Sequence, residues 1–281
     1  MGFCFGVRRA INLVEKEAKQ RVDTSITTYG ALVHNPLVVN RMEKLGVGVV
    51  ERGDMSQITS GVITFTAHGV TPEIIEEAKE RGFEVMDATC PLVTIIQQAA
   101  RKMVEEGYTL IVFGDRNHPE VKGILGWAGG DAFATMDIND LKEMRPPKRL
   151  GIVTQSTQIL EKFREFVCQV HLHFLGKTKE IKVQNTICAP TTRLQGSAHE
   201  LSQECQVIVV IGGKQSANTQ HLADLCQENG ATTYKVEGAD ELNPEWFRGV
   251  ATVGVTAGAS TPDESIQEVV RRLQELDSTL N

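Results

Sequence analysis

The chain of 281 residues has few aromatic side chains and lacks any apolar run long enough to span a membrane. Aromatic residues make up 5% of the sequence and apolar residues 41%, so a large core must be built mainly from aliphatic side chains. A membrane span needs roughly 20 consecutive apolar residues, and the start MGFCFG lacks the charged and then apolar order of a signal peptide. We therefore expect no membrane partner and a cytoplasmic location.

The chain also lacks an excess of positive charge. Its 36 acidic and 29 basic residues give a net charge of −7, which argues against nucleic acid as a partner. The glycine-containing loops have neither the Walker A spacing nor the dinucleotide fingerprint, so ATP and NAD are not supported. An anionic substrate would therefore need a local pocket of cationic groups or N–H donors.

Three of the six cysteines divide the chain into near-equal thirds and share one local setting. Cys4, Cys90 and Cys188 stand in GFCFGVRRAI, DATCPLVTII and NTICAPTTRL, and a helix-like pattern begins directly after each. A thiol at a helix N-terminus loses its proton more readily, because it lies at the positive end of the helix dipole. This setting suits a metal ligand or a nucleophile. Because it occurs three times, we expect the three cysteines to share one site.

The other cysteines and several histidines carry no such signal. A free cysteine is commonly a small buried apolar residue, and a lone histidine is commonly a surface or capping residue. We give these ordinary interpretations to Cys168, Cys205, Cys226, His171, His173, His199 and His221.

Strand-like and helix-like segments alternate along the chain. Each of five short apolar segments runs into a polar loop and then a new helix pattern, at 61–67, 109–114, 150–155, 206–213 and 250–258. This alternation predicts an α/β fold of parallel sheets with helices on both faces. Because the pattern recurs after each of the three cysteines, we expect three similar small modules with mostly parallel sheets. Their predicted bounds are 5–90, 91–184 and 185–281, joined by residues 1–4.

Polar loops follow the strands, where parallel sheets bind their ligands. His34, His68 and His118 lie in such loops, and with helix N-termini they could hold a phosphate. Glu120 follows His118 by two residues, in the first turn of a predicted helix. The helix dipole alone would explain a carboxylate there, but in a loop facing a metal it becomes a candidate proton donor.

Two further loops, GGKQSANT and TAGAST, contain small polar residues at the ends of the last two strands. Ser216, Asn218 and Ser260 can direct hydroxyl, amide and backbone N–H groups toward anionic oxygens. Serine and asparagine also favour helix N-caps. The two roles are compatible.

The motifs GFCFGVRRAI, ALVHNP, TAHGV, DATCP, NHPEVKG, TQST, NTIC, GGKQSANT and TAGASTPD follow one another in this order. From Gly2 to about residue 270 they closely resemble the 4-hydroxy-3-methylbut-2-enyl diphosphate reductases, the last enzymes of the deoxyxylulose phosphate route to isoprenoids. The resemblance implies a [4Fe–4S] cluster held by Cys4, Cys90 and Cys188, with the three modules in a pseudo-threefold trefoil around it. Three thiolates leave one iron open to a substrate oxygen.

The resemblance also implies the reaction and the roles of other residues. An allylic diphosphate would receive two electrons and two protons, lose its hydroxyl group as water, and yield isopentenyl and dimethylallyl diphosphates. Ferredoxin or flavodoxin would supply the electrons. Glu120 would be the proton donor, and the residues expected to contact the substrate are His34, His68, His118, Ser156, Ser216, Asn218 and Ser260.

The chain departs from the family pattern at its start. Relatives usually open with a short strand before the GFC motif, so we expect that strand to be missing or truncated here and Cys4 to lie on a frayed terminus. Two other functions stay open on the residues alone. One is a zinc or thiol enzyme, although the chain lacks the short CxxC or HxxxH spacing of such sites. The other is a phosphate-binding module in which the cysteines only fill the core.

Overall fold

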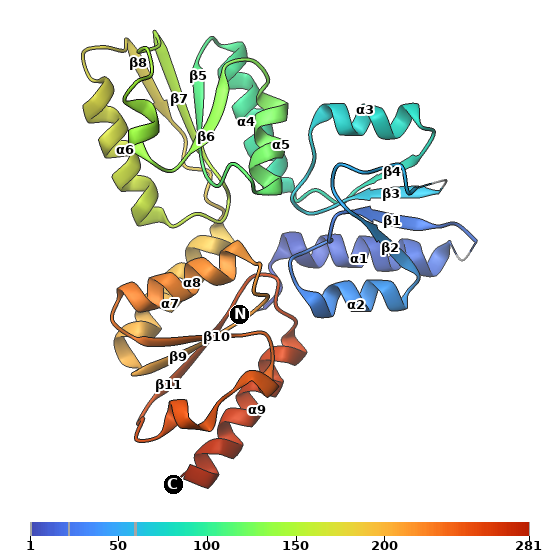
Figure 1. Cartoon of the computed structure of the whole chain (residues 1–281), viewed down its shortest axis with the longest axis vertical. Coiled ribbons are helices and arrows are strands. Elements are labelled where there is room, and N and C mark those ends of the chain that lie inside the picture. Colours follow the sequence, from blue (N-terminus) through green and yellow to red (C-terminus); the bar gives the residue numbers. More distant parts are fainter. Residues whose placement is uncertain (1, 22, 59–60, 281) are drawn as a thin grey trace. The chain divides into compact units, whose positions relative to one another are not determined.

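The computed structural model describes residues 2–21, 23–58 and 61–280, and it contains three parallel β-sheets flanked by helices (Figure 1). The chain divides into two compact units. Unit 1 comprises residues 1–8, 33–41 and 189–281, and unit 2 comprises residues 9–32 and 42–188. Met1 of the predicted linker and Asn281 of the predicted third module lie outside the described residues.

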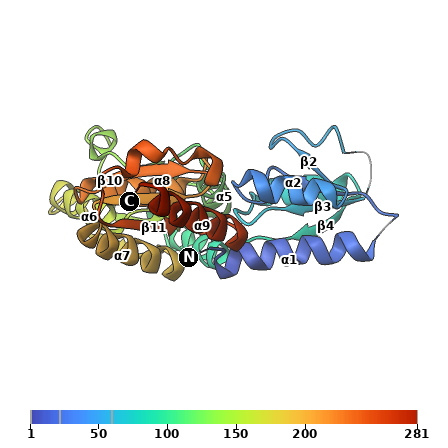
Figure 2. The ribbon, with the colours of Figure 1, turned by 90° about the horizontal axis from the view of Figure 1, so that it is seen from below.

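The first sheet of unit 2 has the strand order β2-β1-β3-β4, all parallel. Its strands are β1 (Ile26–Tyr29), β2 (Val47–Val50), β3 (Val62–Phe65) and β4 (Glu84–Asp87). Helix α3 (Pro72–Glu80) lies in unit 2, whereas α1 (Phe5–Gln20) and α2 (Pro36–Lys44) each begin in unit 1 and end in unit 2. Helix α1 runs beside the sheet (Figure 2), and Ala10, Ile11 and Val14 are its buried apolar residues. Helix α3 packs on the apolar cluster around Phe65.

The second sheet of unit 2 has the order β6-β5-β7-β8 and is covered on both faces. Its strands are β5 (Thr109–Phe113), β6 (Ala132–Thr135), β7 (Arg149–Thr154) and β8 (Glu180–Val183). Successive side chains of β5 point to opposite faces: Leu110 and Val112 pack with α4 (Pro91–Glu105) and α5 (Pro119–Ala128). Ile111 and Phe113 pack with α6 (Leu160–Phe174) and the 3₁₀ helix η1 (Ile138–Leu141).

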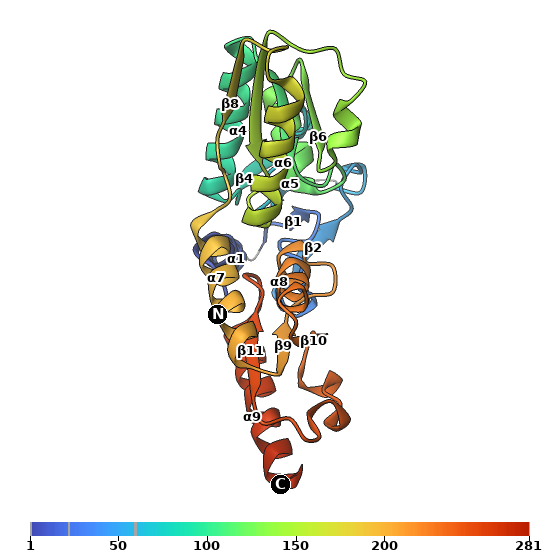
Figure 3. The ribbon, with the colours of Figure 1, turned by 90° about the vertical axis from the view of Figure 1, so that its left-hand side faces the viewer.

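Unit 1 contains the third sheet, with the parallel order β10-β9-β11. Its strands are β9 (Val207–Ile211), β10 (Thr232–Val236) and β11 (Val253–Ala257). Ile208 and Val210 of β9 face α7 (Ala189–Glu204) and α8 (Ala217–Glu228), which lie side by side (Figure 1, Figure 3). The opposite face packs against α9 (Asp263–Leu280) and η3 (Pro244–Phe247), and η2 (Ala239–Glu241) follows β10.

The predicted α/β class is confirmed, and each predicted module contains one of the three sheets. All five predicted strands are present, as β3, β5, β7, β9 and β11. The module boundaries and the threefold placement around a centre stay predictions. Within the described residues, no helix combines the length and apolarity that a membrane crossing requires.

Candidate functional site

A buried carboxyl group marks the carboxyl end of the second sheet. Glu120 lies in the first turn of α5 and is 2% exposed. Ser156, in the loop after the neighbouring strand β7, donates to it twice: the backbone N–H to Oε1 at 2.6 Å and the hydroxyl to Oε2 at 2.8 Å. Burial raises the pKa of Glu120 above its ordinary value, although these hydrogen bonds act in the opposite direction. The carboxyl group therefore keeps its proton to higher pH than in water, as a general acid must.

One imidazole ring is hydrogen-bonded to the backbone of Glu120, and a second ring contacts the first. His118 is the N-cap of α5, and its Nδ1 accepts a hydrogen bond from the backbone N–H of Glu120 at 3.2 Å. A neutral ring with Nδ1 as acceptor carries its proton on Nε2. His68, from the loop after β3, meets His118 edge-on with ring centroids 5.4 Å apart. Unit 2 thus brings four predicted site residues together: His68, His118, Glu120 and Ser156.

Two of the three predicted ligand cysteines are tied to the same loops. The backbone N–H of Cys90, the N-cap of α4, donates to the carbonyl of Ala67 at 3.0 Å. The backbone N–H of Cys188, which directly precedes α7, donates to the carbonyl of Ser156 at 3.0 Å. Both cysteines are half-buried. Each thiol therefore stands at a helix start and beside a loop that carries either an imidazole or Ser156, the partner of the buried acid.

In unit 1, Cys4 is held in place by the loop after β11. Its backbone N–H donates to the carbonyl of Ala259 at 2.9 Å, next to the predicted site residue Ser260. The thiol Sγ accepts a hydrogen bond from the backbone N–H of Val7 at 3.5 Å, within the first turn of α1. The expectation of a frayed Cys4 is therefore wrong, because hydrogen bonds on both sides fix this residue.

The GGKQSANT loop of unit 1 contains a buried amide group available to a ligand. Ser216 is the N-cap of α8 and its hydroxyl accepts from the backbone N–H of Thr219 at 3.3 Å, so the capping role is confirmed. Asn218 is 7% exposed, and neither its Oδ1 nor its Nδ2 has a hydrogen-bond partner among the described residues. A buried polar group left in this state costs about 1–3 kcal/mol. An anionic or hydroxyl-bearing ligand would remove that cost.

Glycines let the loops of unit 1 approach one another closely. A Cβ atom on Gly212 or Gly258 would lie 2.4 or 2.2 Å from Thr219 Oγ1, and one on Gly213 would lie 2.3 Å from the carbonyl oxygen of His34. The loops after β1, β9 and β11 therefore meet near α8. Thr219, fully buried with an Oγ1 that lacks a partner among the described residues, was missed by the sequence analysis. Its position next to Asn218 in the sequence could have indicated that Thr219 also belongs to this site.

The remaining cysteines differ from the three at helix starts. Cys226 is fully buried in α8, and burial raises the pKa of its thiol to about 11. Burial also raises the pKa of Cys205, with a smaller contribution from Glu204. Both fit the interpretation of small apolar residues. The same interpretation was wrong for Cys168, which is exposed.

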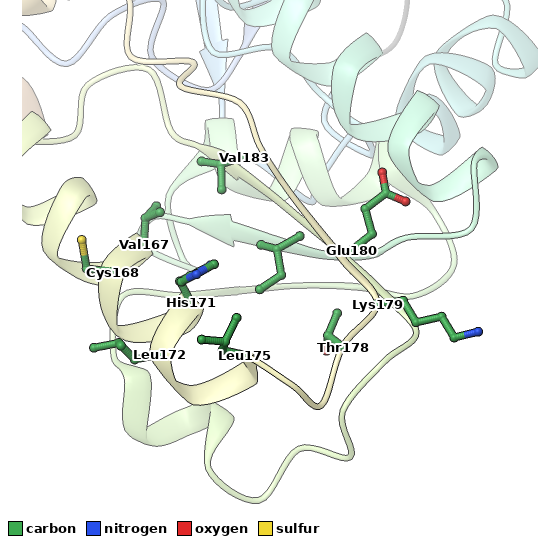
Figure 4. Close-up of a pocket in the computed structure, with 10 residues that line it drawn as sticks. Val167, Cys168, His171, Leu172, Leu175, Thr178, Lys179, Glu180 and Val183 are labelled. Atoms are coloured by element: carbon green, nitrogen blue, oxygen red, sulfur yellow. The ribbon is translucent and has the colours of Figure 1, made fainter.

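Cys168 lines a surface groove of about 550 Å³ between α6 and the segment that includes β8 (Figure 4). The exposed surface of the groove is mostly apolar, and Leu172 and Leu175 are among the large apolar residues exposed to solvent. Its lining includes none of the predicted site residues. The groove is therefore separate from the buried carboxyl group and the imidazoles.

Comparisons with known proteins identify the family of this chain. The family model described as LytB protein matches residues 1–274. The 4-hydroxy-3-methylbut-2-enyl diphosphate reductase of Dehalococcoides mccartyi is 43% identical over 279 residues, with 99% of this chain and 96% of the relative covered. The enzyme of the same name from Aquifex aeolicus is 41% identical, with 98% and 94% covered.

The chain belongs to the LytB family. Solved structures support this assignment. One is an (E)-4-hydroxy-3-methyl-but-2-enyl diphosphate reductase described as the terminal enzyme of the non-mevalonate pathway, with a TM-score of 0.70, 41% identity, and coverage of 98% and 96%. A second, the corresponding reductase from Plasmodium falciparum, has a TM-score of 0.90 at 28% identity, with 97% and 85% covered. The predicted enzyme class, an oxidoreductase, is confirmed by these relatives.

LytB proteins are iron–sulfur proteins, and the donor set of this chain fits such a group. Iron–sulfur clusters take thiolate ligands, and a helix N-terminus favours the thiolate form. Cys4, Cys90 and Cys188 are all half-buried at the starts of α1, α4 and α7. The buried thiol of Cys226, whose pKa is raised to about 11, is unsuited to this role.

Proposed function

We propose that this LytB chain reduces 4-hydroxy-3-methylbut-2-enyl diphosphate to isopentenyl and dimethylallyl diphosphates, with a [4Fe–4S] cluster held by Cys4, Cys90 and Cys188. The observation that carries the proposal is Glu120, a buried acid with a raised pKa whose partner Ser156 is also bonded to the backbone of Cys188. This arrangement connects a proton donor, through Ser156, to the backbone of a predicted cluster ligand. Held by these three cysteines, the cluster would supply electrons, and the iron left without a protein ligand would act as a Lewis acid toward the substrate oxygen.

The hydrogen bonds of Glu120 determine where its proton lies. Oε1 accepts the backbone N–H of Ser156, so the proton of the neutral acid belongs on Oε2, which faces the Ser156 hydroxyl. The hydroxyl donates to the ionised carboxylate; beside the neutral acid it would rotate, accept from Oε2 and donate its own proton onward. Glu120 and Ser156 therefore form a short route by which a proton reaches the departing hydroxyl group of the substrate, which leaves as water.

The diphosphate would be held by hydrogen-bond donors from the loops that follow the strands and from a helix N-terminus. His118 presents its Nε2–H group, and we assign the same task to His34 and His68. The N-terminus of α8 with Ser216 and Asn218 offers further donors, since helix N-termini bind phosphates. Ser260 follows β11 in the loop that also bonds Cys4. Ferredoxin or flavodoxin would deliver the electrons singly.

The first test is the metal content of anaerobically purified protein. We expect iron and acid-labile sulfide in equal amounts, and isopentenyl and dimethylallyl diphosphates as products when a reductant and the substrate are supplied. Stoichiometric zinc without sulfide would instead favour a zinc or thiol enzyme. Diphosphate binding with neither metal nor turnover would favour a phosphate-binding module.

A cysteine pair sharpens this test. Cys90→Ser should remove nearly all bound iron, sulfide and the brown colour, because serine does not replace a thiolate ligand. Cys168→Ser, an exposed position on α6, is the matched control and should keep the wild-type iron content. Equal iron content in the two variants would contradict the ligand assignment.

A further inference from the structure

Arg52 is a half-buried cation that follows β2 in unit 2 and whose described partners are neutral. Its Nη1 donates to the carbonyl of Gly69 at 3.1 Å and its Nη2 to Thr66 Oγ1 at 2.5 Å. The guanidinium group lies 5.9 Å from the ring centroid of Tyr29. Burial lowers the pKa of Arg52 to about 10. Burying a cation among neutral partners costs free energy. A functional role for its hydrogen bonds would explain why an arginine is placed there.

The position of Arg52 is fixed from two sides. The backbone N–H of the next residue, Gly53, donates to the hydroxyl of Tyr29 at 2.6 Å. Gly30 has a φ of +85°, and a Cβ atom on it would lie 2.8 Å from Arg52 Nε. Gly30 therefore leaves the space that the guanidinium group occupies. The guanidinium thus reaches the loop after β3 with little freedom to move.

The donors and acceptors around Thr66 show how Arg52 can affect His68 in that loop. Thr66 is fully buried, and its Oγ1 lies 3.4 Å from His68 Nδ1. A guanidinium group only donates, so Arg52 occupies a lone pair of the Thr66 oxygen and leaves the hydroxyl proton for another acceptor. Nδ1 of His68 lies within hydrogen-bond distance and can accept that proton. The neutral His68 ring then carries its own proton on Nε2.

We propose that Arg52 is a positioning residue that acts through Thr66 to hold His68 in the tautomer with its proton on Nε2. This inference rests on the proposed function, in which His68 contacts the diphosphate. An anionic oxygen requires a donor, and the other tautomer would present a lone pair to it instead. His118 reaches the same tautomer by a different route, because its Nδ1 accepts from the backbone of Glu120. The two rings, which meet edge-on, would thus offer the same kind of donor.

The tautomer is read from the ¹⁵N shifts and two-bond ¹H–¹⁵N couplings of histidine-labelled, oxidised holoprotein, with His68→Gln identifying the His68 signals. We expect the Nε2–H pattern for His68 in the wild type. Thr66→Val keeps the side-chain shape but removes the hydroxyl, so the signals should shift toward a mixture of tautomers. Thr66→Ser, which retains the hydroxyl, should preserve the wild-type pattern.

The same variants should differ in affinity for inorganic pyrophosphate, measured by calorimetry. Loss of one correctly oriented donor should weaken binding about tenfold in Thr66→Val, and Thr66→Ser should stay near the wild-type value. For the substrate, KM should rise by a similar factor while kcat changes little, as expected when binding alone is lost. Arg52→Met should reproduce the effects of Thr66→Val, and Arg52→Lys, which still donates, should stay closer to the wild type. A folded Arg52→Met protein with the wild-type His68 pattern would overturn the role of Arg52.

An unchanged His68 pattern and unchanged pyrophosphate affinity in Thr66→Val would overturn this inference. That result in an active reductase would leave the proposed function standing. Conversely, a wild-type protein with iron and sulfide but no turnover would refute the proposed function, while the tautomer measurement would still support or overturn the role of Arg52.

Discussion

Two helices of unit 2 begin with the same short pattern, and only one of them carries a buried acid. Helix α3 begins with Pro72 and Glu73, and helix α5 begins with Pro119 and Glu120, each after a strand of a parallel sheet. Glu73 is exposed, and hydrogen bonds, above all from the Thr71 side chain, lower its pKa. Glu120 is buried, and desolvation raises its pKa. The local sequence puts both carboxyl groups in the first turn of a helix. Whether a neighbouring loop buries the group then determines the direction of its pKa shift.

The neighbouring loop that makes the difference is the one containing Ser156. It covers Glu120 and satisfies both carboxyl oxygens. A third helix start makes the same point. Asp263 follows Pro262 at the beginning of α9, remains exposed, and forms an ion pair with Arg8 at 3.5 Å. An acid in the first turn is thus common in this chain, and burial beside a hydroxyl group distinguishes Glu120.

The largest expected effect comes from replacing the two acids in parallel. Glu120→Gln should keep the cluster and the diphosphate affinity but lower kcat roughly 10²–10⁴-fold, because it removes the general acid. Glu73→Gln, the matched control, should leave kcat unchanged. Steady-state turnover with a reduced dye measures both. Near-normal kcat in Glu120→Gln would remove Glu120 from the mechanism.

A smaller effect should follow from changing the covering loop. Ser156→Ala removes the hydroxyl next to Oε2 and should lower kcat about ten- to a hundredfold, the value of one hydrogen bond to a reacting group. Ser156→Thr retains the hydroxyl and should stay close to the wild type. Equal kcat values in the alanine and threonine variants would mean that Ser156 acts only as a structural cover.

The smallest effect concerns stability as a function of pH, and its sign differs between the two acids. Because the folded pKa of Glu120 is raised, its contribution is fully present below the ordinary glutamate pKa of about 4.3 and is lost as pH rises through the folded value. The stability of the wild type relative to Glu120→Gln should therefore fall as pH rises.

For Glu73 the pKa is lowered, so its contribution is present above the ordinary value and is lost as pH falls through the folded value. The wild type should lose stability relative to Glu73→Gln only on acidification, and by little, since the group is exposed. Urea unfolding at several pH values measures both differences. The same pH slope for the two pairs would contradict the contrast between these helix starts.

The sequence predicted the buried strands well and the others poorly. The segments that became β3, β5, β7, β9 and β11 are largely apolar, and periodicity is sufficient to recognise such runs. The missed strands are short, and most lie at sheet edges; β8, for example, has the sequence EIKV with exposed ends. The missed strand β1, ITTY, is central but contains two threonines. Edge strands face solvent and lose the apolar signal.

The sequence predicted which residues belong to the candidate site, but not the burial and hydrogen-bond partners of each side chain. Motif order indicated Glu120, Ser156 and Asn218, yet no local pattern separates Glu120 from Glu73. The buried amide of Asn218 and the cation of Arg52 depend on loops from other strands. Such contacts are set by tertiary packing, which neither periodicity nor helix-start signals report.

The most direct test of the central claim is substrate-dependent reoxidation of a reduced dye by the cluster-loaded protein under strictly anaerobic conditions. We expect two electrons to be consumed for each 4-hydroxy-3-methylbut-2-enyl diphosphate converted, with isopentenyl and dimethylallyl diphosphates as products. A protein that contains iron and sulfide in full, yet leaves the dye reduced when the substrate is added, would contradict the account.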